Sequence, residues 1–287
     1  MRFVSYRQKK SCGIAIRHEG SLRGVLEGKV GYPGELKEII AAGKDALRSA
    51  SSVLSQAPVI DERTIEYNPV ISNPSKIICI GLNYRDHSAE SGFVQPEYPS
   101  MFARFSSSLI GHNAPIVRPR VSHCLDYEGE LAVIIGRAGR HIARNEATSY
   151  VAGYAVFNDG SIRDFQHRTP QWTVGKNFDG TGAFGPDFVT ADELPDGAMG
   201  LKIETRLNGQ VVQTSNTEDM VFSVSDLIST ISETLTLSPG DVIVSGTPSG
   251  VGHARNPKLY MKPGDICEVE IERVGILRNT IADEDAI

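Results

Sequence analysis

Two glutamates precede an apolar, β-branched run in the stretch Asp126-Tyr127-Glu128-Gly129-Glu130-Leu131-Ala132-Val133-Ile134-Ile135. Such a run predicts a buried strand. Because side chains alternate across a strand, Glu128 and Glu130 should point to the same face. Two like charges so placed repel one another, and burial makes each charge more costly. A hard divalent cation relieves this repulsion, because such ions prefer carboxylate oxygens.

A third carboxylate follows a second apolar strand. Residues 151–157 predict a strand that ends at Asn158-Asp159-Gly160. Asp159 would complete a three-carboxylate site with Glu128 and Glu130. An all-oxygen set favours Mg²⁺ or Mn²⁺, whereas no His or Cys cluster has the ligand spacing of a zinc site. Taken alone, the two glutamates are also typical of a solvated strand face, but the apolar run indicates a central strand.

Length and charge exclude several classes of protein. The chain has 287 residues and a net charge of −6 without any Lys/Arg-rich run, which argues against a nucleic-acid partner or an anionic membrane surface. No stretch reaches transmembrane length, and the first residues lack the apolar core of a signal peptide, so we expect a cytoplasmic protein. The four cysteines are scattered, and Cys79 and Cys267 lie in apolar runs that favour buried free thiols.

The first part of the chain predicts a small α/β domain over residues 1–72. Residues 12–26 alternate like a hairpin that turns at a Glu-Gly-Ser sequence, and residues 35–54 have the apolar spacing of one amphipathic helix. Asn68-Pro69 and Asn73-Pro74 then interrupt the pattern. We therefore place a domain boundary there, followed by a catalytic domain over residues 73–287.

The second domain is predicted to be mainly β. Residues 76–80 form a short apolar strand, and residues 201–214 alternate around Asn208-Gly209, which is a strong hairpin signal. One helix is indicated over residues 225–235, with a serine cap and Asp226 in its first turn. Helices between the other strands are missing, which excludes a parallel α/β sheet. The predicted class is α+β.

His87 and Glu90 form a second candidate constellation. They lie three residues apart in the polar segment that follows the strand at residues 76–80, so on a helical turn they share one face. A carboxylate that orients an imidazole produces a general base near neutral pH. The alternative is a surface histidine with an incidental partner.

Further polar groups suit an anionic substrate. Arg163, Gln166 and Lys176 follow Asp159 closely and would fit an α-keto carboxylate, although ordinary surface polarity is the alternative. The glycine-rich residues 245–252 include Thr247 and would hold an anion through backbone N–H groups, or form a simple turn. Residues 180–185 match a dinucleotide-binding glycine pattern, but a strand-like run follows instead of a helix, which excludes that function.

Together these motifs resemble the fumarylacetoacetate hydrolase family. The ordered set is G-x-N-Y-x-x-H-x-x-E, D-Y-E-x-E-L, N-D-x-S-x-R-D-x-Q, G-K-x-F-D and S-G-T-P-x-G-V-G, spread from Lys76 to the C-terminus. The resemblance implies a mixed β-roll core, usually in a homodimer, and a small-molecule keto acid as substrate. It assigns these roles: metal ligands Glu128, Glu130 and Asp159; catalytic groups His87, Glu90 and Lys176; substrate-binding groups Tyr84, Arg163, Gln166 and Thr247. Asp126 shares the face of the two glutamates but would overload the metal, so we expect it to support the ligands.

The resemblance implies a metal-dependent hydrolase that cleaves the C–C bond of a 2,4-diketo acid to pyruvate and a carboxylic acid, in aromatic-compound catabolism. The His87–Glu90 pair would activate water, and the metal and Lys176 would stabilise a pyruvate enolate. The alternative is a decarboxylase or isomerase of oxaloacetate-like or 2-hydroxy-diene dicarboxylic acids at the same metal–enolate site. A non-catalytic binding protein is disfavoured because the whole set of groups is intact.

Arg104 marks a departure from the family pattern, since relatives often carry a lysine there. A guanidinium binds a carboxylate through two parallel hydrogen bonds. We therefore predict that Arg104 binds the second carboxylate of a dicarboxylic substrate such as fumarylpyruvate or maleylpyruvate.

Overall fold

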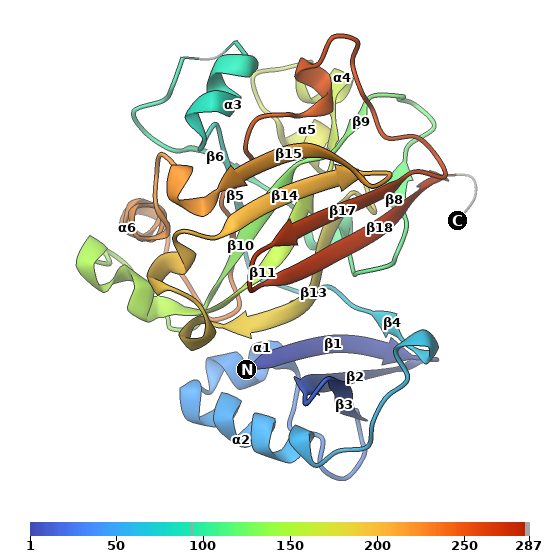
Figure 1. Ribbon diagram of the computed structural model, residues 1–287. Helices are drawn as coiled ribbons and strands as arrows, with labels where there is room; N and C mark the ends of the chain where they lie inside the picture. The colour runs from blue at the N-terminus through green and yellow to red at the C-terminus, as the bar shows by residue number, and fades with distance from the viewer. Residues whose placement is uncertain (93, 285–287) are drawn as a thin grey trace.

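The apolar runs of the sequence become strands of one large mixed sheet in the computed structural model, which describes residues 1–92 and 94–284 (Figure 1). The strands of this sheet follow the order β3-β2-β1-β13-β11-β10-β16-β5-β6, while β4 pairs with β1 and β7 with β13. Their bounds are β1 Arg2–Gln8, β2 Ser11–His18, β3 Ser21–Leu26, β4 Glu66–Tyr67, β5 Ile77–Gly81, β6 Ser100–Ala103, β7 Leu109–Ile110, β10 Gly129–Ile135, β11 Val151–Asp159, β13 Gly182–Thr190 and β16 Val242–Val244.

A second sheet of order β15-β14-β17-β18-β8 lies in front of β10, β11 and β13 in Figure 1. It comprises β8 Ile116–Arg118, β14 Lys202–Leu207, β15 Gln210–Asn216, β17 Ile266–Ile271 and β18 Gly275–Asp283. A short pair, β9 Leu125–Asp126 and β12 Ser161–Ile162, completes the strands of the described residues. The described residues are rich in strand and poor in helix, so the predicted α+β, mainly β class is confirmed.

The helices are short, and one prediction about them is wrong. They are α1 Leu36–Ala41, α2 Lys44–Ser55, α3 Arg85–Glu90, α4 Arg163–Gln166, α5 Thr173–Lys176 and α6 Val224–Thr234. The single helix expected over residues 35–54 is divided into α1 and α2, because Gly43 adopts a φ of +95°, outside the helical region. The helix expected at residues 225–235 is confirmed as α6, where Ser223 and Asp226 form a capping box.

The N-terminal strands extend the large sheet. The hairpin expected in residues 12–26 is confirmed as β2 and β3, and β1 pairs with β13 through Phe3 opposite Phe188. Figure 1 shows this unit below the rest of the chain. The division into domains at residue 72 and the homodimer stay predictions, and residues 285–287 of the second predicted domain lie outside the described residues. Within the described ranges, no helix is long and apolar enough to cross a membrane; the cytoplasmic location stays a prediction.

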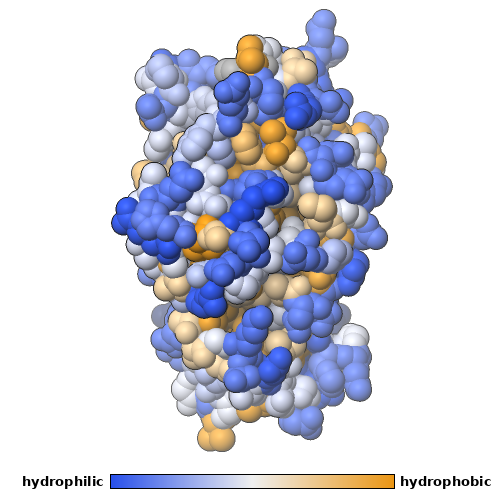
Figure 2. All heavy atoms as spheres, turned by 90° about the vertical axis from the view of Figure 1, so that its left-hand side faces the viewer, coloured by the Kyte–Doolittle hydropathy of each residue, from blue (hydrophilic) through white to orange (hydrophobic). Residues whose placement is uncertain are grey.

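Strand β10 is the centre of the core. All seven of its residues are buried, and its two faces contribute to two different apolar clusters. Leu131 and Val133 pack toward the second sheet and α6, whereas Ala132 and Ile134 pack toward the side that carries α1 and α2. On the outer face drawn in Figure 2, hydrophilic side chains surround small hydrophobic patches. Because β10 is held from both sides, the groups at its N-terminal end are fixed rigidly.

Candidate active site and metal centre

The antiparallel register of β10 and β11 assembles the three predicted metal ligands. Gly129 lies opposite Asn158 and Glu130 opposite Phe157, and the Asp159 N–H donates to the Glu128 carbonyl at 2.8 Å. One carboxylate oxygen from each of Glu128, Glu130 and Asp159 lies within 4.8 Å of the other two. All three side chains are buried. The arrangement expected from alternation along the strand is therefore present.

Gly129 allows the second sheet to approach between the two glutamates. A Cβ at this position would lie 2.3 Å from Thr205 Oγ1 of β14 and 2.9 Å from a methyl of Val269 on β17. Any side chain here would push the sheets apart. The Glu-Gly-Glu pattern thus turns both carboxylates to one face and leaves room for the second sheet at the other.

Two of the three carboxylates, those of Glu128 and Glu130, have very different proton affinities. Burial raises the pKa of Glu130 well above its ordinary value, and the charges of Asp159 and Glu128 raise it further. Burial acts in the same direction on Glu128, but the positive charges of Lys176 and Arg163 outweigh it and lower its pKa to about 2. Glu130 is therefore the carboxylate that lacks a compensating charge.

A charge count over the buried groups of this region gives the same result. Four carboxylates face three cations, all of them buried: Asp126, Glu128, Glu130 and Asp159 against Arg104, Arg163 and Lys176. With every group ionised, one negative charge is left over, which is unfavourable in a protein interior. A divalent cation would convert this surplus into one net positive charge, which suits an anionic substrate. The oxygen-only ligand set fits such an ion.

Two buried cations, Lys176 and Arg163, bind carboxylates of the triad. Lys176 Nζ of α5 donates to Glu128 Oε2 at 2.6 Å and to Asp159 Oδ2 at 2.7 Å. Arg163 Nη1 of α4 lies 2.6 Å from Glu128 Oε1 and donates to Gln166 Oε1 at 3.0 Å. Burial opposes the charge of Lys176, yet Asp159 and Glu128 raise its pKa, so it stays an ammonium. All three expected groups therefore lie in the site.

Asp126 supports this arrangement as expected. Its carboxylate accepts from Arg163 Nε at 2.8 Å and from the backbone N–H groups of Gly252 and His253 at 2.8 and 2.9 Å. It thereby ties α4 to the loop after β16. The same carboxylate also accepts from the Tyr127 N–H, so its oxygens are saturated and Asp126 is separate from the triad.

The His87–Glu90 pair lies over the cavity on α3. His87 Nδ1 is 2.9 Å from Glu90 Oε1, as a helical spacing of three residues predicts. Glu90 also accepts from the Gly250 N–H at 3.0 and 2.9 Å with its two oxygens. The carboxylate therefore fixes the imidazole and fastens α3 to the loop of residues 245–252.

That loop contacts Glu130, one of the three predicted metal ligands, directly. The Gly246 N–H donates to Glu130 Oε2 at 2.5 Å, and Gly246 has a φ of +102°, which favours glycine. Thr247 lines the cavity, but its hydroxyl donates to the Gly129 carbonyl at 3.0 Å and accepts from Gln213 at 2.8 Å. The Thr247 hydroxyl therefore links the loop to β10, and its role as a substrate ligand stays a prediction.

Two predicted substrate ligands are not brought to the cavity. Arg104 is buried behind the triad, where its guanidinium forms an ion pair with Asp159 and donates to Thr181 Oγ1 at 2.7 Å. The described partners of this guanidinium are protein groups and Arg104 does not line the cavity, so the structure does not support the prediction that it binds a second substrate carboxylate. Tyr84 is also buried and faces a different cavity, beside Asp219 and Pro248.

The candidate active site is a cavity of about 370 Å³. Figure 1 shows α3, α4 and α5, which carry several of its lining residues, in the upper part of the molecule. Among the lining residues that sequence reasoning missed are four with ring side chains, which are Phe102, His167, Trp172 and His253. Isolated aromatic residues have no characteristic spacing, so the sequence does not indicate Phe102 or Trp172. The two histidines directly follow Gln166 and Gly252, and this position beside the motifs is their only signal in the sequence. Trp172 packs on Gly81, where a Cβ would lie 2.1 Å from the indole ring.

Comparison with known proteins adds three relatives. Oxaloacetate tautomerase Fahd2a, mitochondrial, from Rattus norvegicus is 41% identical over 251 residues, which cover 87% of this chain and 80% of the relative. Oxaloacetate tautomerase FAHD2A, mitochondrial, from Homo sapiens is 40% identical over 98% of this chain and 91% of the relative. Maleylpyruvate hydrolase from Sphingobium sp. SYK-6, solved with manganese(II) and pyruvate, is 25% identical at a TM-score of 0.81 over 99% of both chains.

These relatives correct the predicted reaction. The expected C–C bond hydrolase of acylpyruvates is contradicted, because the curated relatives at 40 and 41% identity are oxaloacetate tautomerases. The error has a physical cause. An imidazole held by a carboxylate can activate water, but it equally moves a proton to or from carbon, so the His87–Glu90 pair does not specify hydrolysis. The groups that stabilise an enolate do not distinguish the two reactions.

The acidic triad and the manganese-bound relative together support a divalent-metal site in this chain. The model of the fumarylacetoacetate (FAA) hydrolase C-terminal family matches residues 76–282, which hold every predicted site residue. The chain therefore belongs to the fumarylacetoacetate hydrolase family.

Proposed function

We propose that this protein is a metal-dependent tautomerase that interconverts the enol and keto forms of oxaloacetate or a closely similar 2-keto dicarboxylic acid. The observation that carries the proposal is the buried triad of Glu128, Glu130 and Asp159 beside a histidine suited to proton transfer. The buried charged groups around the triad, counted together with it, are one positive charge short of neutrality. The identity of 40 and 41% with oxaloacetate tautomerases supports the reaction class.

The three carboxylates would hold Mg²⁺ or Mn²⁺, which prefer oxygen ligands and leave positions for water and substrate. The bound ion would draw electron density from the 2-oxo group of the substrate and thereby acidify the neighbouring C3–H bonds. Lys176 adds a fixed positive charge at the same place, 2.6 Å from Glu128 Oε2.

His87 would carry the proton. Glu90 binds Nδ1 of its ring, so Nε2 is the nitrogen that takes a proton from C3 of the keto form or returns one to the enol. Because Glu90 also accepts from the Gly250 N–H, the imidazole is held in place over the cavity. No bond between carbon atoms breaks in this reaction.

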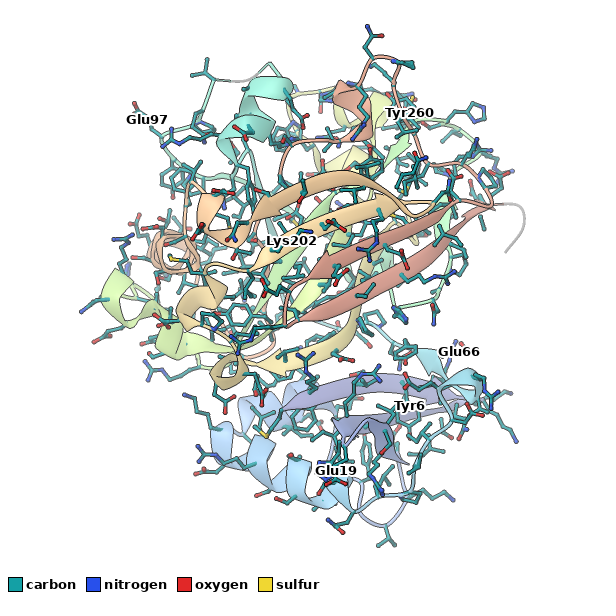
Figure 3. All side chains as sticks on the ribbon, in the orientation of Figure 1. Tyr6, Glu19, Glu66, Glu97, Lys202 and Tyr260 are labelled. Carbon is teal, nitrogen blue, oxygen red and sulfur yellow. The ribbon has the colours of Figure 1, made fainter. Side chains whose placement is uncertain are left out.

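The experiment is a spectroscopic assay of enol-oxaloacetate decay with protein stripped by EDTA and refilled with Mg²⁺ or Mn²⁺. We expect acceleration only after refilling, and its loss in Glu130→Gln. Glu19→Gln is the matched control, because Glu19 is exposed in the N-terminal hairpin, at the opposite end of the molecule from Tyr260 (Figure 3). Acceleration that survives both EDTA and Glu130→Gln would refute the proposal.

A further inference from the structure

Arg104 lies behind the triad and does not line the cavity, so the second carboxylate of a dicarboxylic substrate lacks the partner that the sequence suggested. Most polar groups of the cavity wall are already engaged: Lys176 with Glu128 and Asp159, and the Thr247 hydroxyl with the backbone of Gly129. A substrate that chelates the metal through its first carboxylate and 2-oxo group needs further hydrogen-bond donors for its distal carboxylate.

His167 and His253 offer ring N–H donors on one wall of the cavity. Their rings lie 5.3 Å apart between centroids, with an angle of 32° between the planes, and both line the cavity together with Glu128 and Glu130. His167 directly follows α4, whereas His253 comes from the loop after β16. The pair therefore joins two segments that the chain brings together from distant positions.

The surroundings of the pair are positive. His253 Nδ1 is 2.7 Å from the Tyr260 hydroxyl, and Lys258 Nζ is 3.4 Å from each nitrogen of the same ring. Tyr260 lies at the end of the molecule where α4 and α5 are found (Figures 1 and 3). Tyr260 and Lys258 thus hold the His253 ring, and Lys258 adds a positive charge beside it.

Arg163 supplies an independent observation. Its Nη2 is buried and finds no hydrogen-bond partner within the part of the chain that the structure describes, although Nε and Nη1 are both engaged. Arg163 lines the cavity and is the first residue of α4, the helical turn whose C-cap is His167. An unpaired buried donor is costly, and an anionic ligand would satisfy it.

Asp126 fixes the geometry of these groups. It accepts from Arg163 Nε and from the His253 N–H, so one saturated carboxylate locks the guanidinium and the backbone of the histidine against each other. A site whose donors are positioned before binding loses little entropy when the ligand arrives.

We propose that His167, His253 and the Nη2 group of Arg163 form the subsite for the distal carboxylate of the substrate. This inference rests on the proposed function in so far as it assumes a dicarboxylic 2-keto acid. It accounts for selectivity: a monocarboxylic analogue would keep the metal-chelating end and lose these contacts.

The test compares malate with lactate, which differ only in the distal carboxylate, by calorimetric titration of the Mg²⁺-loaded protein. Wild type should bind malate at least about tenfold more tightly than lactate. The double variant His167→Gln/His253→Gln should lose most of this preference and keep its lactate affinity within about twofold. His18→Gln is the control, because that ring is exposed in the N-terminal hairpin beside Glu19.

Equal affinities in wild type, or an equal loss for both ligands in the double variant, would overturn the subsite. Should the double variant unfold, the two single variants, checked by circular dichroism, carry the same comparison. Neither ligand needs to react, so the result is separate from the proposed function. A protein that prefers malate but does not accelerate enol decay would retain the subsite and refute the tautomerase.

Discussion

Arg104 and Asp159 form an ion pair in which both side chains are completely inaccessible to solvent. Breaking a buried pair from one side leaves an uncompensated charge, which costs about 3–5 kcal/mol. We therefore expect Arg104→Met to lower the free energy of unfolding of the EDTA-treated protein by about that amount, measured by urea denaturation. Arg104→Lys should lose less. Full stability of Arg104→Met combined with a raised KM would instead restore the substrate role that the sequence suggested.

Lys176 competes with a cation for two of the three triad carboxylates, since its ammonium donates to both Glu128 and Asp159. Lys176→Met should therefore bind Mn²⁺ more tightly than wild type while kcat falls by about two to three orders of magnitude. Titration of Mn²⁺ by electron paramagnetic resonance gives the first value, and the enol assay gives the second. A purely structural lysine would lower both together, which would refute this assignment.

His87→Gln removes the proposed proton carrier but none of the triad. We expect kcat to fall by about 10²- to 10⁴-fold with unchanged Mn²⁺ affinity. Glu90→Gln should have a smaller effect on kcat, because the amide still accepts from Gly250 but no longer stabilises a charged imidazole. Wild-type kcat in His87→Gln would exclude the dyad from the chemistry.

His112 makes stability depend on pH. Burial, together with the charges of Arg17 and Arg278, lowers the pKa of His112 from 6.5 to about 4. The unfolded chain therefore binds the proton more readily, and stability falls as the pH drops from about 6.5 toward 4. His112→Gln should show a smaller decrease in Tm over this interval than wild type. An identical decrease in both proteins would contradict the shifted pKa.

The sequence predicted the structure correctly where the regular spacing of residues along one strand or one helix determines it. Alternation placed Glu128 and Glu130 on one face, and the apolar run after Glu130 indicated a central strand; both features are present. The spacing of His87 and Glu90 likewise predicted a contact within one helical turn.

Contacts between distant segments could not be predicted in this way. Nothing local to Arg104 shows that Asp159, which lies 55 residues later, takes its guanidinium away from the cavity. The meeting of His167 and His253 depends on Asp126, which ties α4 to the loop after β16. The single helix expected over residues 35–54 failed for a simpler reason, because the positive φ of Gly43 has no periodic signature.

The central claim is that the triad-bound metal and His87 exchange a proton at C3 of a 2-keto dicarboxylic acid. The most direct measurement is proton NMR of oxaloacetate in D₂O with the Mg²⁺-loaded protein. The account predicts loss of the C3 proton signal faster than the spontaneous exchange, abolished by EDTA and by Glu130→Gln but not by Glu19→Gln, without pyruvate formation above background. Exchange at the spontaneous rate, or release of pyruvate in its place, would contradict it.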